Sequence, residues 1–103
     1  MNLSIVNLNL KNFYMAKKRR KLNKDFEKKI YSSKKNVELV LAKIYDIYDE
    51  DIQKEYMTAF NKVVYLYDEL KQGYEQQGFN DNSEELFTNY KNAFNLFESE
   101  FEI

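Results

Sequence analysis

The residues with the clearest chemical potential form a run of cations near the start of the chain. Ammonium and guanidinium groups at this density neutralise phosphates or carboxylates, which is typical of surfaces that bind nucleic acid or an acidic protein. The same pattern is also typical of a solvated helix face, or of a segment that pairs with acids of its own chain. The candidate binding residues of this basic patch are Lys17, Lys18, Arg19, Arg20, Lys21, Lys24 and Lys28.

A second candidate surface is acidic, because carboxylates on helix faces can occupy a positively charged channel in a partner. The triplet 49–51 stands where a new helix would begin, and acids in a first turn meet the positive end of the helix dipole. We therefore interpret this triplet as a helix start rather than a metal site. The alternative binding residues on this acidic surface are Asp46, Asp49, Glu50, Asp68 and Glu69.

Most catalytic equipment is missing from the 103 residues. The chain has no His and no Cys, which excludes the usual triad base, a cysteine nucleophile, disulfides and the common zinc ligands. With no Pro and two Gly, it also lacks a glycine-rich phosphate loop. We therefore predict a non-enzymatic protein that needs no cofactor and no metal.

The charge is divided unevenly along the chain. Residues 11–35 contain eleven basic and two acidic residues, whereas residues 36–103 contain five Lys and fifteen Asp or Glu. Opposite signs in the two halves favour either an acidic partner for the first half or packing of the halves against each other. A homodimer, in which the basic segment of each copy meets the acidic surface of the other, is one expectation from this layout.

Apolar residues recur every three or four positions, and this spacing predicts the elements that must position these charges. Ser32 and Ser33 offer a break, Gly78 a helix stop, and Asn82 with Glu85 a start that resembles a capping box. Residues 1–14 fit either a strand or a helix. The predicted helices are 15–31, 34–49, 51–77 and 83–101, and a continuous helix over 34–77 is the rival for the middle two.

These elements predict one all-α domain over residues 1–103, a three- or four-helix bundle with short connections. It would have a basic N-terminal helix and an acidic C-terminal half. Tyr31, Tyr45 and Tyr65 fall off the main stripes, so we expect them to be exposed. The residues at the centres of the stripes predict a core that includes Leu41, Ile44, Phe60, Val63, Tyr67, Phe94 and Phe97.

No segment reaches the roughly 18–20 apolar residues of a membrane span. The basic cluster follows the moderately apolar start of the chain, whereas a secretory signal has its cations first. We therefore expect a cytoplasmic protein without a membrane span. Lys outnumbers Arg, and Asn and Tyr are frequent, a composition of AT-rich codons that favours a phage or mobile element in a low-GC bacterium.

The leading hypothesis is a small interaction protein encoded by a phage or mobile element. It would bind a host protein or nucleoprotein complex, such as a defence, replication or transcription factor, and inhibit or redirect it by steric and electrostatic occlusion. The first alternative is direct binding of nucleic acid by a basic helix over residues 17–29. The second alternative is an immunity-type protein that acts at a membrane surface.

Overall fold

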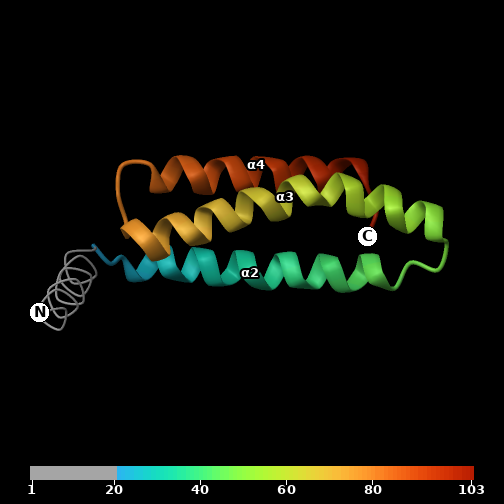
Figure 1. The fold of residues 1–103 in the computed structure, drawn as a ribbon, viewed down its shortest axis with the longest axis horizontal. Coiled ribbons are helices and arrows are strands. Elements are labelled where there is room, and N and C mark those ends of the chain that lie inside the picture. The colour runs from blue at the N-terminus through green and yellow to red at the C-terminus, as the bar shows by residue number, and fades with distance from the viewer. Residues whose placement is uncertain (1–20) are drawn as a thin grey trace, which may run out of the picture.

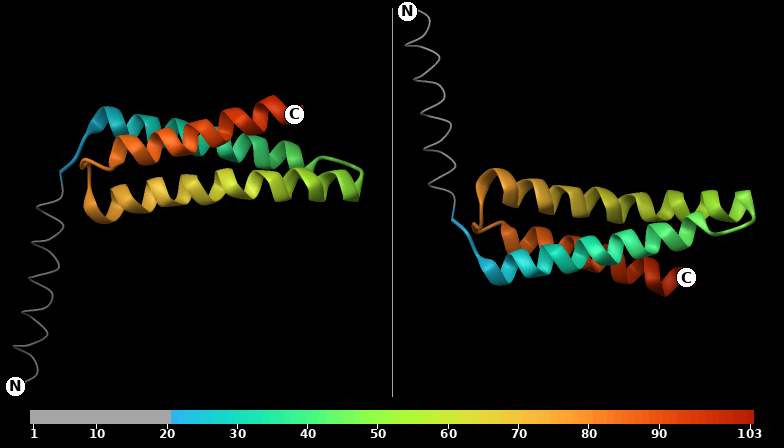
Figure 2. Two further views of the ribbon diagram at one scale, coloured as in Figure 1. Left: turned by 90° about the horizontal axis from the view of Figure 1, so that it is seen from above. Right: turned by 90° about the horizontal axis from the view of Figure 1, so that it is seen from below.

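A computed structural model describes residues 21–103 of the chain. Residues 1–20 lie outside this part, and with them the ambiguous segment 1–14 and the beginning of the predicted helix 15–31. The described residues are all-α, and 82% of them are helical. The helices are α2 (Lys24–Tyr45), α3 (Glu50–Gln77) and α4 (Ser83–Glu100). They lie side by side with alternating directions, and α3 packs against both α2 and α4 (Figures 1 and 2).

Helix α2 begins later than the sequence predicts. The side-chain oxygen of Asn23 accepts a hydrogen bond from the Phe26 N–H at 3.0 Å, which makes Asn23 the N-cap. Just before it, the Lys21 carbonyl accepts the Phe79 N–H at 2.8 Å, and Lys21 bridges to Gly78. The predicted helix over 15–31 is therefore wrong for residues 21–23, because the Lys21 backbone pairs with the α3–α4 connection and the Asn23 N–H donates to the Tyr74 hydroxyl instead.

The predicted break at Ser32 and Ser33 is also wrong, since α2 runs straight through both residues. The hydroxyl of the buried Ser33 donates to the Lys29 carbonyl one turn earlier, at 2.8 Å. This bond satisfies the hydroxyl inside the helix, so the serine has no need of a cap position.

Two helices, not one, cover residues 34–77. The Asp49 side chain accepts the N–H groups of Asp51 and Ile52 at 2.9 and 3.0 Å, so Asp49 is the N-cap of α3. The interpretation of the acidic triplet as a helix start is thus confirmed, and the rival single helix is wrong. The predicted helix over 34–49 is wrong for residues 46–49, because α2 ends at Tyr45; Tyr48 lies in the connection and is 100% exposed.

The connection from α3 to α4 contains one confirmed and one wrong prediction. Gly78 ends α3 with φ of 74°, a positive value that only glycine adopts without strain, and its N–H donates to the Tyr74 carbonyl at 2.8 Å. Asn82 makes no side-chain cap, so the capping-box prediction is wrong. Ser83 and Asn80 shape the turn instead, because the buried Ser83 hydroxyl accepts the Asn80 N–H at 2.9 Å.

The core runs along α3 between its two neighbours. Rings of Phe94 and Phe97 on α4 meet Phe60 on α3 with centroids 6.1 and 4.8 Å away, both edge to face. Six of the seven predicted core residues are buried; Leu41 is only half-buried, because it lies on the flank of α2. The three tyrosines expected outside are exposed. The confirmed core residues are Ile44, Phe60, Val63, Tyr67, Phe94 and Phe97.

Candidate functional site

The basic patch falls only partly within the structure. Four of its residues lie outside the described part of the chain, so their role in binding stays a prediction: Lys17, Lys18, Arg19 and Arg20. Lys21, Lys24 and Lys28 are exposed at the end where α3 joins α4. Because residues 21–23 are not helical, the described part of the patch does not continue as one helical stripe.

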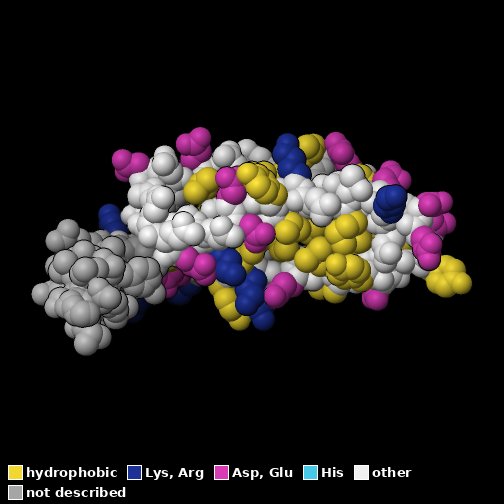
Figure 3. Space-filling view, in the orientation of Figure 1, with side chains coloured by type: hydrophobic (Ala, Val, Ile, Leu, Met, Phe, Trp, Pro, Cys, Tyr) yellow, Lys and Arg dark blue, Asp and Glu magenta, His cyan; other side chains and the backbone are white. Residues whose placement is uncertain are grey.

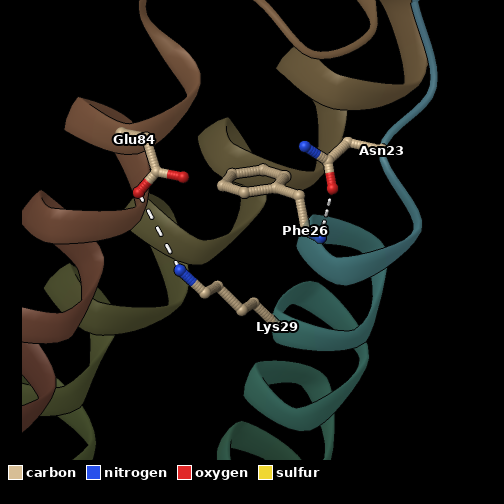
Figure 4. A network of polar contacts seen from close by, with 4 residues as sticks. All are labelled: Asn23, Phe26, Lys29 and Glu84. Atoms are coloured by element: carbon tan, nitrogen blue, oxygen red, sulfur yellow. Dashed lines mark hydrogen bonds and ion pairs between the residues drawn. The ribbon is translucent and has the colours of Figure 1, made fainter.

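The start of α2 is fastened to the other two helices. The Tyr74 hydroxyl on α3 accepts the Asn23 N–H at 2.9 Å and donates to the Glu27 carboxylate at 2.5 Å. Figure 4 shows the neighbouring contacts, in which Asn23 caps α2 and Lys29 reaches across to Glu84 on α4. The Lys29–Glu84 ion pair is 3.9 Å long and both side chains are about half exposed, so it contributes little stability.

Other lysines of α2 remain unneutralised by the described part of the chain. Lys24, Lys28 and Lys35 are exposed and follow one another at spacings of four and seven residues, which places them on one outer line of the helix. None of them forms an ion pair with an acid among residues 21–103, where Lys29–Glu84 is the pair within salt-bridge distance. Among the described residues, no carboxylate therefore competes with an external anion for this line.

The acidic candidates divide into two groups. Asp46, Asp49 and Glu50 lie together at the end where α2 joins α3, whereas Asp68 and Glu69 lie further along α3. Asp49 also has a structural role, as the N-cap of α3. The structure thus brings together three of the five predicted acidic residues.

Sequence reasoning missed further acids at the same end. The C-terminus of α4 returns beside the first turns of α3, as the Tyr56–Phe101 ring contact at 4.8 Å shows. An acidic run at the end of the chain was the available signal, but its place beside α3 depends on the antiparallel packing. We call the following eight exposed carboxylates the acidic end: Asp46, Asp49, Glu50, Asp51, Glu55, Glu98, Glu100 and Glu102.

No carboxylate of the acidic end forms an ion pair with a described residue. In Figure 3, acidic side chains crowd the region where α2 and α3 are connected. Exposed apolar side chains stand among them, namely Tyr45, Tyr48 and Ile52. The region therefore combines negative charge with apolar surface, as binding surfaces for cationic partners do.

A shallow cavity of about 440 Å³ opens beside these carboxylates. Asp51, Glu55 and one cation, Lys54, line it on α3, and Phe101 closes it from the end of α4. The Phe101 ring is held by Phe97, whose ring stacks on it at 5.0 Å. Carboxylates next to an aromatic wall suit a Lys or Arg side chain, whose stem packs on the ring while its head meets the acids.

Two tyrosines have perturbed hydroxyl groups, and both belong to the core rather than to the acidic end. Burial raises the pKa of Tyr67 above its usual value, and the neighbouring carboxylates of Asp68, Glu38 and Glu75 raise it further. Burial also raises the pKa of Tyr90, although the side-chain hydroxyl of Ser33 opposes the shift; the Tyr90 hydroxyl itself donates to the Ser33 carbonyl at 3.4 Å. These shifts bear on stability and not on chemistry at a binding site.

Within residues 21–103, no three acidic side chains gather closely enough to hold a metal ion. In the same part of the chain, no helix is long and apolar enough to cross a bilayer. Comparison with protein-family models, with curated proteins and with solved structures finds no match to this chain. Its function is therefore argued from its own residues.

Proposed function

We propose that this chain is a non-enzymatic interaction protein that binds a basic surface of a host macromolecule through its acidic end. The observation that supports this proposal is the gathering of eight exposed carboxylates, without ion-pair partners in the described chain, at one end of the molecule, where two of them line a cavity with an aromatic wall. Such a surface attracts cations over long range and accelerates encounter with a positively charged partner.

Binding at this end would relieve a cost that the isolated protein carries. Like charges gathered on one surface repel each other, and a cationic partner neutralises them. Tyr48, which is wholly exposed between Asp46 and Asp49, supplies apolar area at the centre of the charge. Exposed tyrosines surrounded by complementary charge are frequent anchors of protein interfaces.

The partner class that fits best is a nucleic-acid-binding protein of the host. Its phosphate-binding channel is lined with Lys and Arg, which the carboxylates of the acidic end would engage in place of phosphates. Occupation of that channel would inhibit a defence, replication or transcription factor without any catalysis. We propose that the chain acts in this way in the cytoplasm, encoded by a phage or mobile element.

The test compares two pairs of charge removals on α3. Asp51→Asn with Glu55→Gln removes both carboxylates that line the cavity, while Asp68→Asn with Glu69→Gln removes the same charge further along the helix. Tagged proteins are incubated with lysate of the source host, and captured proteins are eluted with duplex DNA and identified. We expect the first pair to abolish capture of a DNA-eluted partner and the second to preserve it; equal capture by both pairs would refute the proposal.

A second candidate function rests on the outer line of α2. Lys24, Lys28 and Lys35 form no ion pair with the acids of the described chain, a placement that also suits a phosphate backbone. If they bind nucleic acid directly, replacing all three by Ala should shallow the log–log salt dependence by about 0.7–0.9 for each phosphate that is no longer neutralised. Replacing Lys54, Lys62 and Lys91 is the matched control. The membrane-surface alternative stays a prediction, which liposome flotation would test.

A further inference from the structure

The face of the molecule formed by α2 and α3, away from α4, carries a groove that no other described residue, among 21–103, covers. A cavity of about 260 Å³ lies in it, with Ile30 and the rings of Tyr67 and Tyr74 as its floor. Tyr31 stands at its wall and is exposed. In Figure 3, hydrophobic side chains gather between α2 and α3 further along the same face.

Helical spacing places further apolar residues on this face, beyond the cavity and toward the end of α2. Leu41 lies seven residues beyond Lys34, which lines the cavity, and Val64 lies seven residues before Lys71, which also lines it. Positions seven apart share a helix face, so the half-buried Leu41 and Val64 continue the apolar surface of this face. Met57 repeats the spacing once more.

Charges of both signs alternate along the α2 rim. Lys34 lines the cavity, and Glu38 follows one turn later on the same side, close enough to Tyr67 to raise the pKa of its hydroxyl. A rim with a cation and an anion one turn apart is self-complementary under a twofold rotation. If the rotation axis passes between positions 34 and 38, Lys34 of one copy lies opposite Glu38 of the second copy, and Glu38 lies opposite Lys34.

We infer that this α2/α3 face binds a second copy of the chain in antiparallel orientation. In that arrangement α2 lies along the partner's α2, and Lys34 of each copy faces Glu38 of the other. The same axis brings Tyr31 of one copy to Leu41 of the other, because these residues lie symmetrically about it. The acidic end of each copy then lies beside the opposite end of its partner, where Lys21, Lys24 and Lys28 are exposed.

The available area is sufficient for a specific dimer. The 22 residues of α2 span about 33 Å at a rise of about 1.5 Å each. Two adjacent helices present a face roughly 20 Å wide. Each copy would therefore bury about 650 Å², or about 1,300 Å² in total, which is at the lower end of stable interfaces.

The test uses two single charge reversals and their mixture. In the Lys34→Glu variant, positions 34 and 38 are both anionic, and in the Glu38→Lys variant both are cationic. Each contact between two copies of the same variant therefore places like charges opposite each other, and they repel. We expect light scattering to show a dimer of the wild-type chain between about 1 and 200 µM, and at least about tenfold weaker self-association of each variant. Mixing the two variants places opposite charges at every contact and should restore a dimer.

Lys62→Glu is the matched control, because it makes the same charge change on the side of α3 that faces α4. It should leave the dimer unchanged. Circular dichroism at low concentration checks that each monomer is folded, since the reversals also place like charges one turn apart within α2. A monomeric wild-type chain at about 200 µM would overturn the inference. So would a mixture of the variants that stays monomeric, or a control that weakens the dimer equally.

Discussion

The hydroxyl of Tyr74, near the end of α3, accepts the backbone N–H of Asn23 at 2.9 Å. Asn23 caps α2, so this contact holds the start of one helix against the end of another. Together with the Phe79–Lys21 backbone bond, it fixes where the chain enters the described fold. The position of the start of α2, which carries Lys24 and Lys28, is therefore set in part by a tyrosine that is distant in the sequence.

Replacing Tyr74 by Phe should weaken the attachment of the start of α2 to α3. The variant loses the acceptor for Asn23 N–H and the donor for Glu27, and we expect the free energy of unfolding to fall by about 1 kcal/mol. Hydrogen exchange should show faster exchange of the Asn23 amide, while amides in the middle of α3 stay protected. Tyr65→Phe, at an exposed site on the same helix, is the control and should change neither quantity.

Phe94 should be a major contributor to stability. Its side chain is 5% exposed and meets Phe60 on α3, so truncation to Ala leaves a cavity between the two helices. We expect the loss in the free energy of unfolding to be about 3–5 kcal/mol, measured by urea denaturation. Leu96→Ala, two residues along at a site 56% exposed, should cost far less. Equal losses for the two variants would show that Phe94 does not pack in the core.

The two candidate helix caps should respond differently to substitution. Asp49 accepts two N–H groups at the start of α3, so Asp49→Ala should destabilise the protein by about 1 kcal/mol. Asn82 makes no side-chain cap, and Asn82→Ala should change the stability by only a few tenths of a kcal/mol. Thermal melts of both variants measure the difference, and a larger effect at Asn82 would contradict the assigned caps.

Alkaline pH should destabilise the fold through two buried hydroxyls. The pKa values of Tyr67 and Tyr90 are raised above the usual 10.0. Above about pH 10 the unfolded chain therefore releases these protons while the folded chain retains them, so the free energy of unfolding falls as pH rises further. Below that pH both states hold the protons and no slope arises from these groups.

Chemical denaturation between about pH 8 and pH 11.5 measures this slope. Replacing Tyr67 and Tyr90 together by Phe should flatten it, whereas Tyr31→Phe, at an exposed site, should leave it unchanged. If the double variant keeps the wild-type slope, the alkaline loss of stability arises from other groups.

The amino-acid sequence by itself determined that the described chain is helical and which faces of its helices are buried, but not every point at which a helix begins or ends. Residues such as Phe60 and Phe94 recur at helical spacing, and burial of a periodic stripe is a local consequence of helix geometry. Gly78 also ended α3 as predicted, because its positive φ is a property of the residue itself. These features depend on residues within one or two helical turns of each other in the sequence, so each can be predicted from a single segment.

Other features were decided only by the tertiary structure, because they arise between segments far apart in the chain. Helix α2 starts at Lys24 since the Lys21 carbonyl is taken by the Phe79 N–H, beyond the end of α3. The acidic end likewise combines Asp51 on α3 with Glu98 on α4, which only the antiparallel return of α4 brings to the same region. The periodicity within one segment carries no information about such pairings, because the two segments come close to each other only when the helices pack.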